Sequence, residues 1–201
     1  MKRLKEYIFP VDGVTILEAP NRVRIIMIGG PGSGKSTYSE IMEKKLNIPH
    51  IYTGDMMRKL SKENPMVKDL LARGEFAPTH TVIKAVQERL EKPDTYMGYI
   101  FDGFPRNIEQ AKEMEKVGIK YDSVIYLDVS KEEVIRRLTA RGRADDKPEI
   151  IIKRLEVFER ETAPLLEYYK DELIKIKAEG GTPQEIAQTI IDKVQWKILM
   201  T

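Results

Sequence analysis

A short glycine-rich stretch carries the clearest chemical signal in the chain. Residues 29–36 read Gly-Gly-Pro-Gly-Ser-Gly-Lys-Ser and directly follow the apolar run from Val23 to Ile28. Glycines at this spacing let successive backbone N–H groups point toward one anion, and the lysine adds a mobile positive charge. A helix that begins near Ser36 directs the positive end of its dipole at the same point. The pattern G-x-x-x-x-G-K-[ST] after a strand predicts a binding site for the phosphates of a nucleoside triphosphate.

A carboxylate is placed to serve such a site. Ile100-Phe101-Asp102 is an apolar run that ends in one carboxylate, at the strand edge where open α/β sheets bind ligands. Sites of this kind use an aspartate from a second strand to hold Mg²⁺. The alternative is that Asp102 only caps the turn into Gly103, and Asp128 at the end of a third run is a second candidate.

Several arginines complete the set of side chains that could act on phosphates. Phosphoryl transfer is catalysed mainly by positioning and by stabilising charge, and the planar fork of arginine matches phosphate oxygens. The candidates lie in loops or near the ends of expected helices: Arg58, Arg106, Arg137, Arg141, Arg143 and Arg154.

The elements that must position these side chains follow from the alternation of apolar runs and helical patterns. Four runs are predicted as strands: Val23–Ile28, Tyr99–Phe101, Ser123–Val129 and Leu173–Lys177. Helical patterns fill most of the intervals: 37–46, 54–92, 107–116, 131–141, 149–169 and 183–194. Residues 130–133 and 182–185 read as capping boxes at two helix starts. Short strands alternating with helices predict an α/β fold with a mainly parallel sheet.

Composition excludes several classes of protein. The 201 residues include 34 basic and 32 acidic side chains, for a net charge of +2, which argues against a dedicated nucleic-acid or membrane-surface protein. There is no cysteine, so disulfides and thiolate metal sites are excluded. We find no signal peptide and no apolar stretch long enough to cross a membrane, and we expect a cytoplasmic protein.

Features outside the motifs receive simpler interpretations. Glu6–Phe9 and Val14–Leu17 flank a turn and predict an N-terminal hairpin. We expect it to cover an edge of the sheet, with a monomer as the default and an oligomer contact as the alternative. We also expect His50 to be a loop residue and Trp196 to be a packing anchor.

Four motifs in order resemble those of adenylate kinases. They are Thr53-Gly54-Asp55-Met56-Met57-Arg58, then Asp102-Gly103-Phe104-Pro105-Arg106 with Gln110, then Arg141-Gly142-Arg143-Ala144-Asp145-Asp146, and finally Thr162-Ala163-Pro164-Leu165-Leu166-Glu167-Tyr168-Tyr169. The similarity runs from about Arg24 to about Val194.

The resemblance implies a P-loop NTPase fold with a mainly parallel five-stranded sheet flanked by helices. It places a nucleoside monophosphate kinase domain at 23–201, after an extension at 1–22. Within the domain it implies a helical NMP-binding insertion at about 53–82 and a short lid at about 141–148. The implied activity is reversible, Mg²⁺-dependent transfer of a phosphoryl group from ATP to AMP, giving two ADP.

Two other functions remain open from the sequence. The first is a kinase for UMP or CMP, or one of broad specificity; Thr53 and Gln110 favour adenine, whereas Asn107 after Arg106 favours a pyrimidine. The second is a non-catalytic nucleotide-binding module, against which the set of arginines argues. An RNA-binding role has little support, since the basic segment Lys2–Lys5 has no interleaved aromatic side chains.

The resemblance also implies roles for individual residues. Those expected to bind ATP are Gly32, Ser33, Gly34, Lys35, Ser36, Thr37, Arg137, Arg141 and Gly181. Those expected to bind AMP are Thr53, Arg58, Glu75, Phe76, Ala77, Gly103, Phe104, Pro105, Arg106, Gln110, Arg143 and Arg154. Lys35, Arg106, Arg143 and Arg154 are the expected catalytic residues, and Asp145 and Asp146 resemble the pair that orients these arginines.

The chain departs from the family pattern at two places that bear on metals. Ser36 stands where adenylate kinases usually have glycine, so Mg²⁺ is expected at Ser36 and Asp102, held directly or through water. The lid is the short form, with no room for a metal knuckle, and no structural zinc is expected.

Overall fold

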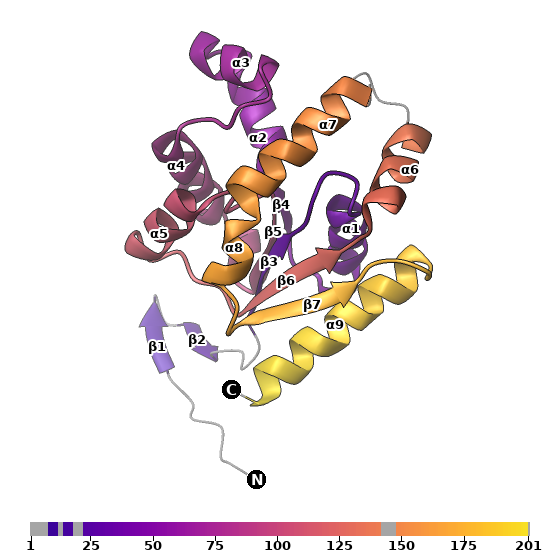
Figure 1. The fold of residues 1–201 in the computed structure, drawn as a ribbon. Coiled ribbons are helices and arrows are strands. Elements are labelled where there is room, and N and C mark those ends of the chain that lie inside the picture. The colour runs from indigo at the N-terminus through magenta and orange to yellow at the C-terminus, as the bar shows by residue number, and fades with distance from the viewer. Residues whose placement is uncertain (1–7, 12–13, 18–21, 142–147, 201) are drawn as a thin grey trace.

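A parallel sheet of five strands forms the centre of the computed structural model, which describes residues 8–11, 14–17, 22–141 and 148–200 (Figure 1). The strand order is β4-β5-β3-β6-β7, and every neighbouring pair runs parallel. The strands are β3 (Val23–Ile28), β4 (His50–Tyr52), β5 (Gly98–Asp102), β6 (Ser123–Asp128) and β7 (Leu173–Lys177). The predicted α/β class is therefore confirmed.

Strand β4 is the element that the residue pattern did not reveal. The interpretation of His50 as a loop residue was wrong, because His50 begins this edge strand and pairs in register with Ile100 of β5. Three residues between Pro49 and a helix are too short for an alternating pattern to be recognised.

Helices cover both faces of the sheet (Figure 1). On one face lie α1 (Lys35–Leu46) and α9 (Pro183–Met200), which contact each other. On the other face lie α2 (Thr53–Leu60), α4 (Thr79–Leu90), α5 (Ile108–Lys116) and α8 (Pro164–Tyr168), and α3 (Pro65–Ala72) packs against α2 away from the strands. The remaining helical segments are η1 (Pro93–Thr95), α6 (Lys131–Arg141), α7 (Pro148–Val157) and the π-helical η2 (Phe158–Thr162).

The central strand supplies side chains to two separate cores. Ile25 and Met27 pack in the cluster formed with α1 and α9, whereas Ile26 and Ile28 pack in the cluster on the opposite face. This alternation follows from the two-residue repeat of a strand, and it explains why β3 reads as a continuous apolar run. Burial on both faces fixes the direction in which β3 ends, and thus the position of the loop that follows it.

The C-terminal helix differs from its prediction in length and in packing. It continues to Met200, because residues 195–200 contain no glycine or proline that would end it. Trp196 is 65% exposed, so the expectation that it is a packing anchor was wrong. No helix in the described part of the chain is both long and apolar enough to cross a membrane.

The described part of the N-terminal extension forms a separate two-stranded sheet. Strand β1 (Ile8–Val11) pairs antiparallel with β2 (Val14–Leu17), with Ile8 opposite Leu17 and Val11 opposite Val14. The other residues of the 1–22 extension, apart from Arg22, lie outside the described ranges.

Gly98 is the position in the sheet where we expect a substitution to be most disruptive to folding. Its φ is +139°, and a Cβ atom there would lie 2.1 Å from the backbone oxygen of Val23, its partner in the β3–β5 register. Gly98→Ala should lower the free energy of unfolding by about 3 kcal/mol, as measured by urea denaturation. Gly118→Ala is the control, because Gly118 has a positive φ but nothing within 4 Å of the added Cβ. Equal losses in the two variants would contradict the role of the close approach.

Candidate active site

The glycine-rich loop links β3 to α1 and takes a conformation that requires glycine. Gly32 has a φ of +76° and Gly34 a φ of +94°, both in the left-handed region that L side chains rarely adopt. A Cβ on Gly34 would also lie 2.6 Å from the ring of Tyr38. Gly34 is the N-cap of α1, so the positive end of the helix dipole lies at the end of this loop.

Lys35 reaches back into the loop. Its Nζ donates to the carbonyl oxygen of Gly29 at 2.5 Å and to that of Gly30 at 2.9 Å. Burial of the ammonium lowers the pKa of Lys35 to about 8; the charges of Arg106 and Arg154 act in the same direction, and Asp102 opposes them. Neighbouring positive charges thus make this site costly for a cation and favourable for an anion.

The lowered pKa of Lys35 predicts proton uptake when a phosphate ligand binds. Bound phosphates favour the ammonium and raise this pKa from about 8, so at pH 8.5 ATP binding should take up a large fraction of one proton. At pH 6.5 Lys35 is already charged in the free protein and contributes no uptake. The lowered pKa also affects stability: below pH 8 the charged Lys35 lowers the free energy of unfolding by its full amount, and this loss disappears as the pH rises from 8 toward 10.5.

The measurement is isothermal titration calorimetry of ATP without Mg²⁺, in two buffers of different ionisation enthalpy. The apparent enthalpies should differ between the buffers at pH 8.5 and should agree more closely at pH 6.5. Lys35→Arg keeps the charge but does not titrate in this range, so it should abolish the difference at pH 8.5. A wild-type protein with no buffer dependence at pH 8.5 would contradict the assignment.

Asp102 lies at the end of β5, directly beside this loop, and is 1% exposed. Its Oδ2 accepts a hydrogen bond from Ser36 Oγ at 2.5 Å and lies 3.2 Å from His50 Nε2, which donates because a carboxylate can only accept. Burial raises the pKa of Asp102, but His50, Lys35 and Ser36 together outweigh burial and hold the pKa below its usual value. Asp102 therefore stays ionised.

His50 is a site residue that sequence reasoning missed. Its backbone N–H donates to Glu43 Oε1 at 2.9 Å, and its ring is nearly buried against Asp102. The second candidate carboxylate, Asp128, instead pairs with Lys175 at 3.0 Å and has a half-exposed side chain. Of the two aspartates that end apolar runs, only Asp102 contacts the loop.

Arg106 follows β5 and is fixed from several directions. Its backbone N–H donates to Gln110 Oε1 at 2.9 Å, and its carbonyl accepts from Thr162 Oγ1 at 2.8 Å. The side chain donates through Nε to the carbonyl of Gly103 at 3.0 Å and lies over the ring of Phe76, 5.1 Å from its centroid. Burial lowers the pKa of Arg106. The guanidinium is thus held in place in surroundings that favour an anionic partner.

Arg58 on α2 lies near the same place. It forms an ion pair with Asp55, and its Cζ lies 5.1 Å from the centroid of the Tyr52 ring. Arg58 and Arg154 are both among the positive charges that lower the pKa of Arg106, while Arg154 also lowers that of Lys35. The charges of Lys35, Arg58 and Arg154 are therefore all coupled to Arg106, directly or through its effect on Lys35.

Arg137 joins the loop from the other side of β3. It lies on α6, where Glu133 Oε1 accepts from its Nε at 2.7 Å. Its terminal nitrogens donate to the carbonyl of Ser33 at 3.3 Å and to that of Ala178 at 2.6 Å. Because Ser33 belongs to the glycine-rich loop, Arg137 lies at the predicted phosphate site.

The predicted base-contacting residues line the approach to Arg106. Thr53 Oγ1 donates to the carbonyl of Gly103 at 2.7 Å, and a Cβ on Gly103 would lie 3.0 Å from the guanidinium of Arg106. The side chain of Phe104 is fully buried and packs edge-on against Phe101 at 5.2 Å. The segment can therefore present its backbone, but not the Phe104 ring, to a ligand.

Other predicted residues have partners within the protein. Glu75 is exposed and pairs with Arg73 at 3.1 Å, and Ala77 is buried in the core. The buried Gln110 amide oxygen accepts from Arg106. Thr37 and Gly181 are exposed.

Part of the predicted site lies outside the described residues. This applies to the side chain of Arg141, to Arg143, and to the predicted orienting pair of Asp145 and Asp146. Among the side chains that are described, no group of three or more His, Asp or Glu residues is placed to hold a metal ion. The expectation about zinc concerns the lid and stays a prediction.

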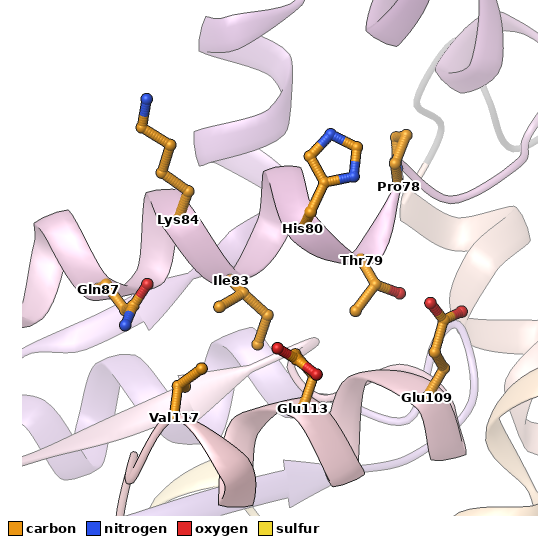
Figure 2. A pocket seen from close by; sticks show the side chains of 9 residues that line it. All are labelled: Pro78, Thr79, His80, Ile83, Lys84, Gln87, Glu109, Glu113 and Val117. Carbon is orange, nitrogen blue, oxygen red and sulfur yellow. The ribbon is translucent and has the colours of Figure 1, made fainter.

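A groove of about 630 Å³ between α4 and α5 is separate from this cluster (Figure 2). Its lining includes His80, Lys84, Glu109 and Glu113, with Glu109 and Glu113 rising from α5 toward α4. None of the residues that we predicted for the site lines it.

Comparisons with known proteins agree with this geometry. The family described as adenylate kinase matches residues 27–174. The adenylate kinase of Corynebacterium diphtheriae is 42% identical over 176 residues, which are 84% of this chain and 97% of that protein. The adenylate kinases of Corynebacterium aurimucosum and Mycobacteroides abscessus are 41% and 40% identical, over 82% and 83% of this chain and 94% and 97% of their own lengths.

Proposed function

The chain belongs to the adenylate kinase family of phosphotransferases, and we propose that it transfers a phosphoryl group reversibly from Mg·ATP to AMP, giving two ADP. One observation carries the proposal: the buried carboxylate of Asp102 acts on both Lys35 and Arg106, and the charges of Arg58 and Arg154, from two further elements, also act on Arg106. A reaction between two phosphate chains needs several fixed cations at one place, whereas a simple binding module does not.

The position of each cation supports its role. The glycine-rich loop, Lys35 and Arg137 hold the donor phosphates, since Arg137 is anchored to the loop itself. Arg58 and Arg106 hold the acceptor phosphate on the β4–β5 side. Arg154 acts on the group in transfer, because its charge is felt by both Lys35 and Arg106.

The residues beside Lys35 fit a magnesium ion. Ser36 Oγ and the ionised carboxylate of Asp102 lie 2.5 Å apart, and both offer the hard oxygen ligands that Mg²⁺ prefers. These two residues would hold the ion directly or through water, and the ion would neutralise charge on the donor phosphates. On the protein side, His50 orients Asp102 through its bond to Oδ2.

The experiment that tests the function is a coupled assay for ADP formation, in which AMP, UMP and CMP are compared as acceptors in separate reactions. We expect AMP to give the highest kcat/KM, because Thr53 and Gln110 lie at the acceptor side next to Gly103 and Arg106. A higher value with UMP or CMP would show a pyrimidine-directed kinase. Tight ATP binding with no transfer to any acceptor would show a non-catalytic module and overturn the proposal.

A further inference from the structure

The side chain of Tyr52 lies at the end of β4, next to helix α2, and has no role in the proposed reaction so far. Strand β4 alternates its side chains, so His50 and Tyr52 point to the same side, with ring centroids 6.1 Å apart and planes within 19°. A Cβ on Gly54 would lie 2.8 Å from the Tyr52 ring, so this ring lies directly against the first turn of α2. The ring is thereby placed between the strand edge and the helix that carries Arg58.

Tyr52 contacts Arg58 through its ring and also through its hydroxyl, with which Arg58 forms a side-chain hydrogen bond. The guanidinium carbon is 5.1 Å from the ring centroid, within the range of a cation–π contact. Burial lowers the pKa of Arg58, but Tyr52 and Asp55 act against burial and the net shift is upward. Tyr52 also favours the charged form of Arg106, so its phenol lies near both predicted acceptor arginines.

The contact with Tyr52 restricts the orientations that the Arg58 guanidinium can adopt. Arg58 has a side chain that is 56% exposed, and an exposed arginine otherwise samples many rotamers. The ring contact restrains the guanidinium without engaging its N–H groups, and the Tyr52 hydroxyl engages only some of these five N–H groups and leaves others. Those groups remain available for a two-point contact with a phosphate once the exposed pair with Asp55 is exchanged.

We propose that Tyr52 is a positioning residue for the acceptor: its ring holds the guanidinium of Arg58 in the orientation that receives the phosphate of the nucleoside monophosphate. This inference rests on the proposed function, because it assigns Arg58 to the acceptor phosphate. In this proposal Tyr52 restricts the conformations of Arg58 and does not itself contact the reacting atoms.

The test compares Tyr52→Leu, which removes the aromatic face, with Tyr52→Phe, which keeps the face and removes only the hydroxyl. Tyr52→Leu should raise the KM for AMP five- to tenfold, with the KM for ATP within twofold of the wild-type value. Tyr52→Phe loses the hydrogen bond from Arg58 to the hydroxyl but keeps the ring, so it should raise the KM for AMP less than threefold and keep the KM for ATP within twofold. Tyr96→Leu is the matched control, since Tyr96 is a 64% exposed tyrosine outside the cluster, and it should change neither KM.

A double-mutant cycle shows whether Tyr52 acts through Arg58. In an Arg58→Ala background, Tyr52→Leu should cause no further rise in the KM for AMP. An unchanged KM for AMP in Tyr52→Leu, an equal rise in both KM values, or a full additional effect without Arg58 would each overturn the inference. Tyr52→Phe behaving like Tyr52→Leu would also overturn it, because the hydroxyl would then be the active part. A wild-type protein with no activity toward AMP would instead reject the proposed function, and this inference with it.

Discussion

Arg106→Ala is expected to lower kcat about a thousand-fold, which corresponds to about 4 kcal/mol of transition-state stabilisation. The guanidinium is oriented by Gly103 and Phe76, and its backbone is fixed by Gln110 and Thr162, so no reorganisation is needed when charge develops on the phosphoryl group. Steady-state and single-turnover assays with ATP and AMP measure the effect.

The stability of the same variant separates catalysis from structure. Burial lowers the pKa of Arg106, which means that the folded protein disfavours its charge, so removing the side chain should not lower the melting temperature. Arg106→Lys should recover only part of the activity, because a point charge cannot replace the planar fork. Arg160→Ala removes an exposed arginine and should leave kcat unchanged. A large drop in melting temperature for Arg106→Ala would show a structural side chain.

Lys35→Ala is expected to lower kcat/KM for ATP by about a thousand-fold or more. Lys35 is the only basic residue in the sequence of the loop, residues 29–36, and its ammonium stabilises the donor phosphates. The loop carbonyls of Gly29 and Gly30 also lose their donor, but water can replace it at a partly exposed site. Lys35→Met keeps most of the side-chain volume and should show the same loss, measured with ATP as the varied substrate.

A lysine on the same helix provides the control for Lys35. Lys44 is exposed in the last turn of α1, so Lys44→Ala should keep wild-type kcat/KM. Activity of Lys35→Ala within tenfold of the wild type would mean that the backbone N–H groups and helix α1 alone stabilise the donor phosphates.

What the sequence predicted well was local. The glycine-rich loop needs particular residues at particular spacing, and its conformation at Gly32 and Gly34 follows from them. Asn107 caps α5 by accepting from the N–H of Gln110 at 2.9 Å, and Thr182 and Glu185 form the predicted capping box of α9. These signals depend on neighbours within four residues, which a single sequence displays.

What it could not predict depends on contacts between distant segments. The Ser130 capping box is only half formed: the N–H of Glu133 donates to Ser130 Oγ at 3.3 Å, but the N–H of Ser130 donates to Glu179 Oε1, which lies 49 positions away in the chain. The bond from Thr162 to Arg106 joins residues 56 positions apart. The pairing of the three-residue strand β4 with β5 brings His50 to Asp102, and β4 is too short for a periodic pattern in the sequence to predict this pairing.

The order of strands separates two tasks. Strand β3 lies in the middle of the sheet and carries the donor loop, β4 and β5 on one flank lead to Arg58 and Arg106, and β6 on the other flank leads to Arg137. Under the proposed roles, substitutions in α2 can therefore alter the choice of acceptor while Lys35 and the glycine-rich loop stay unchanged. Within such an architecture, new acceptor preferences can evolve by remodelling one side of the molecule at a time.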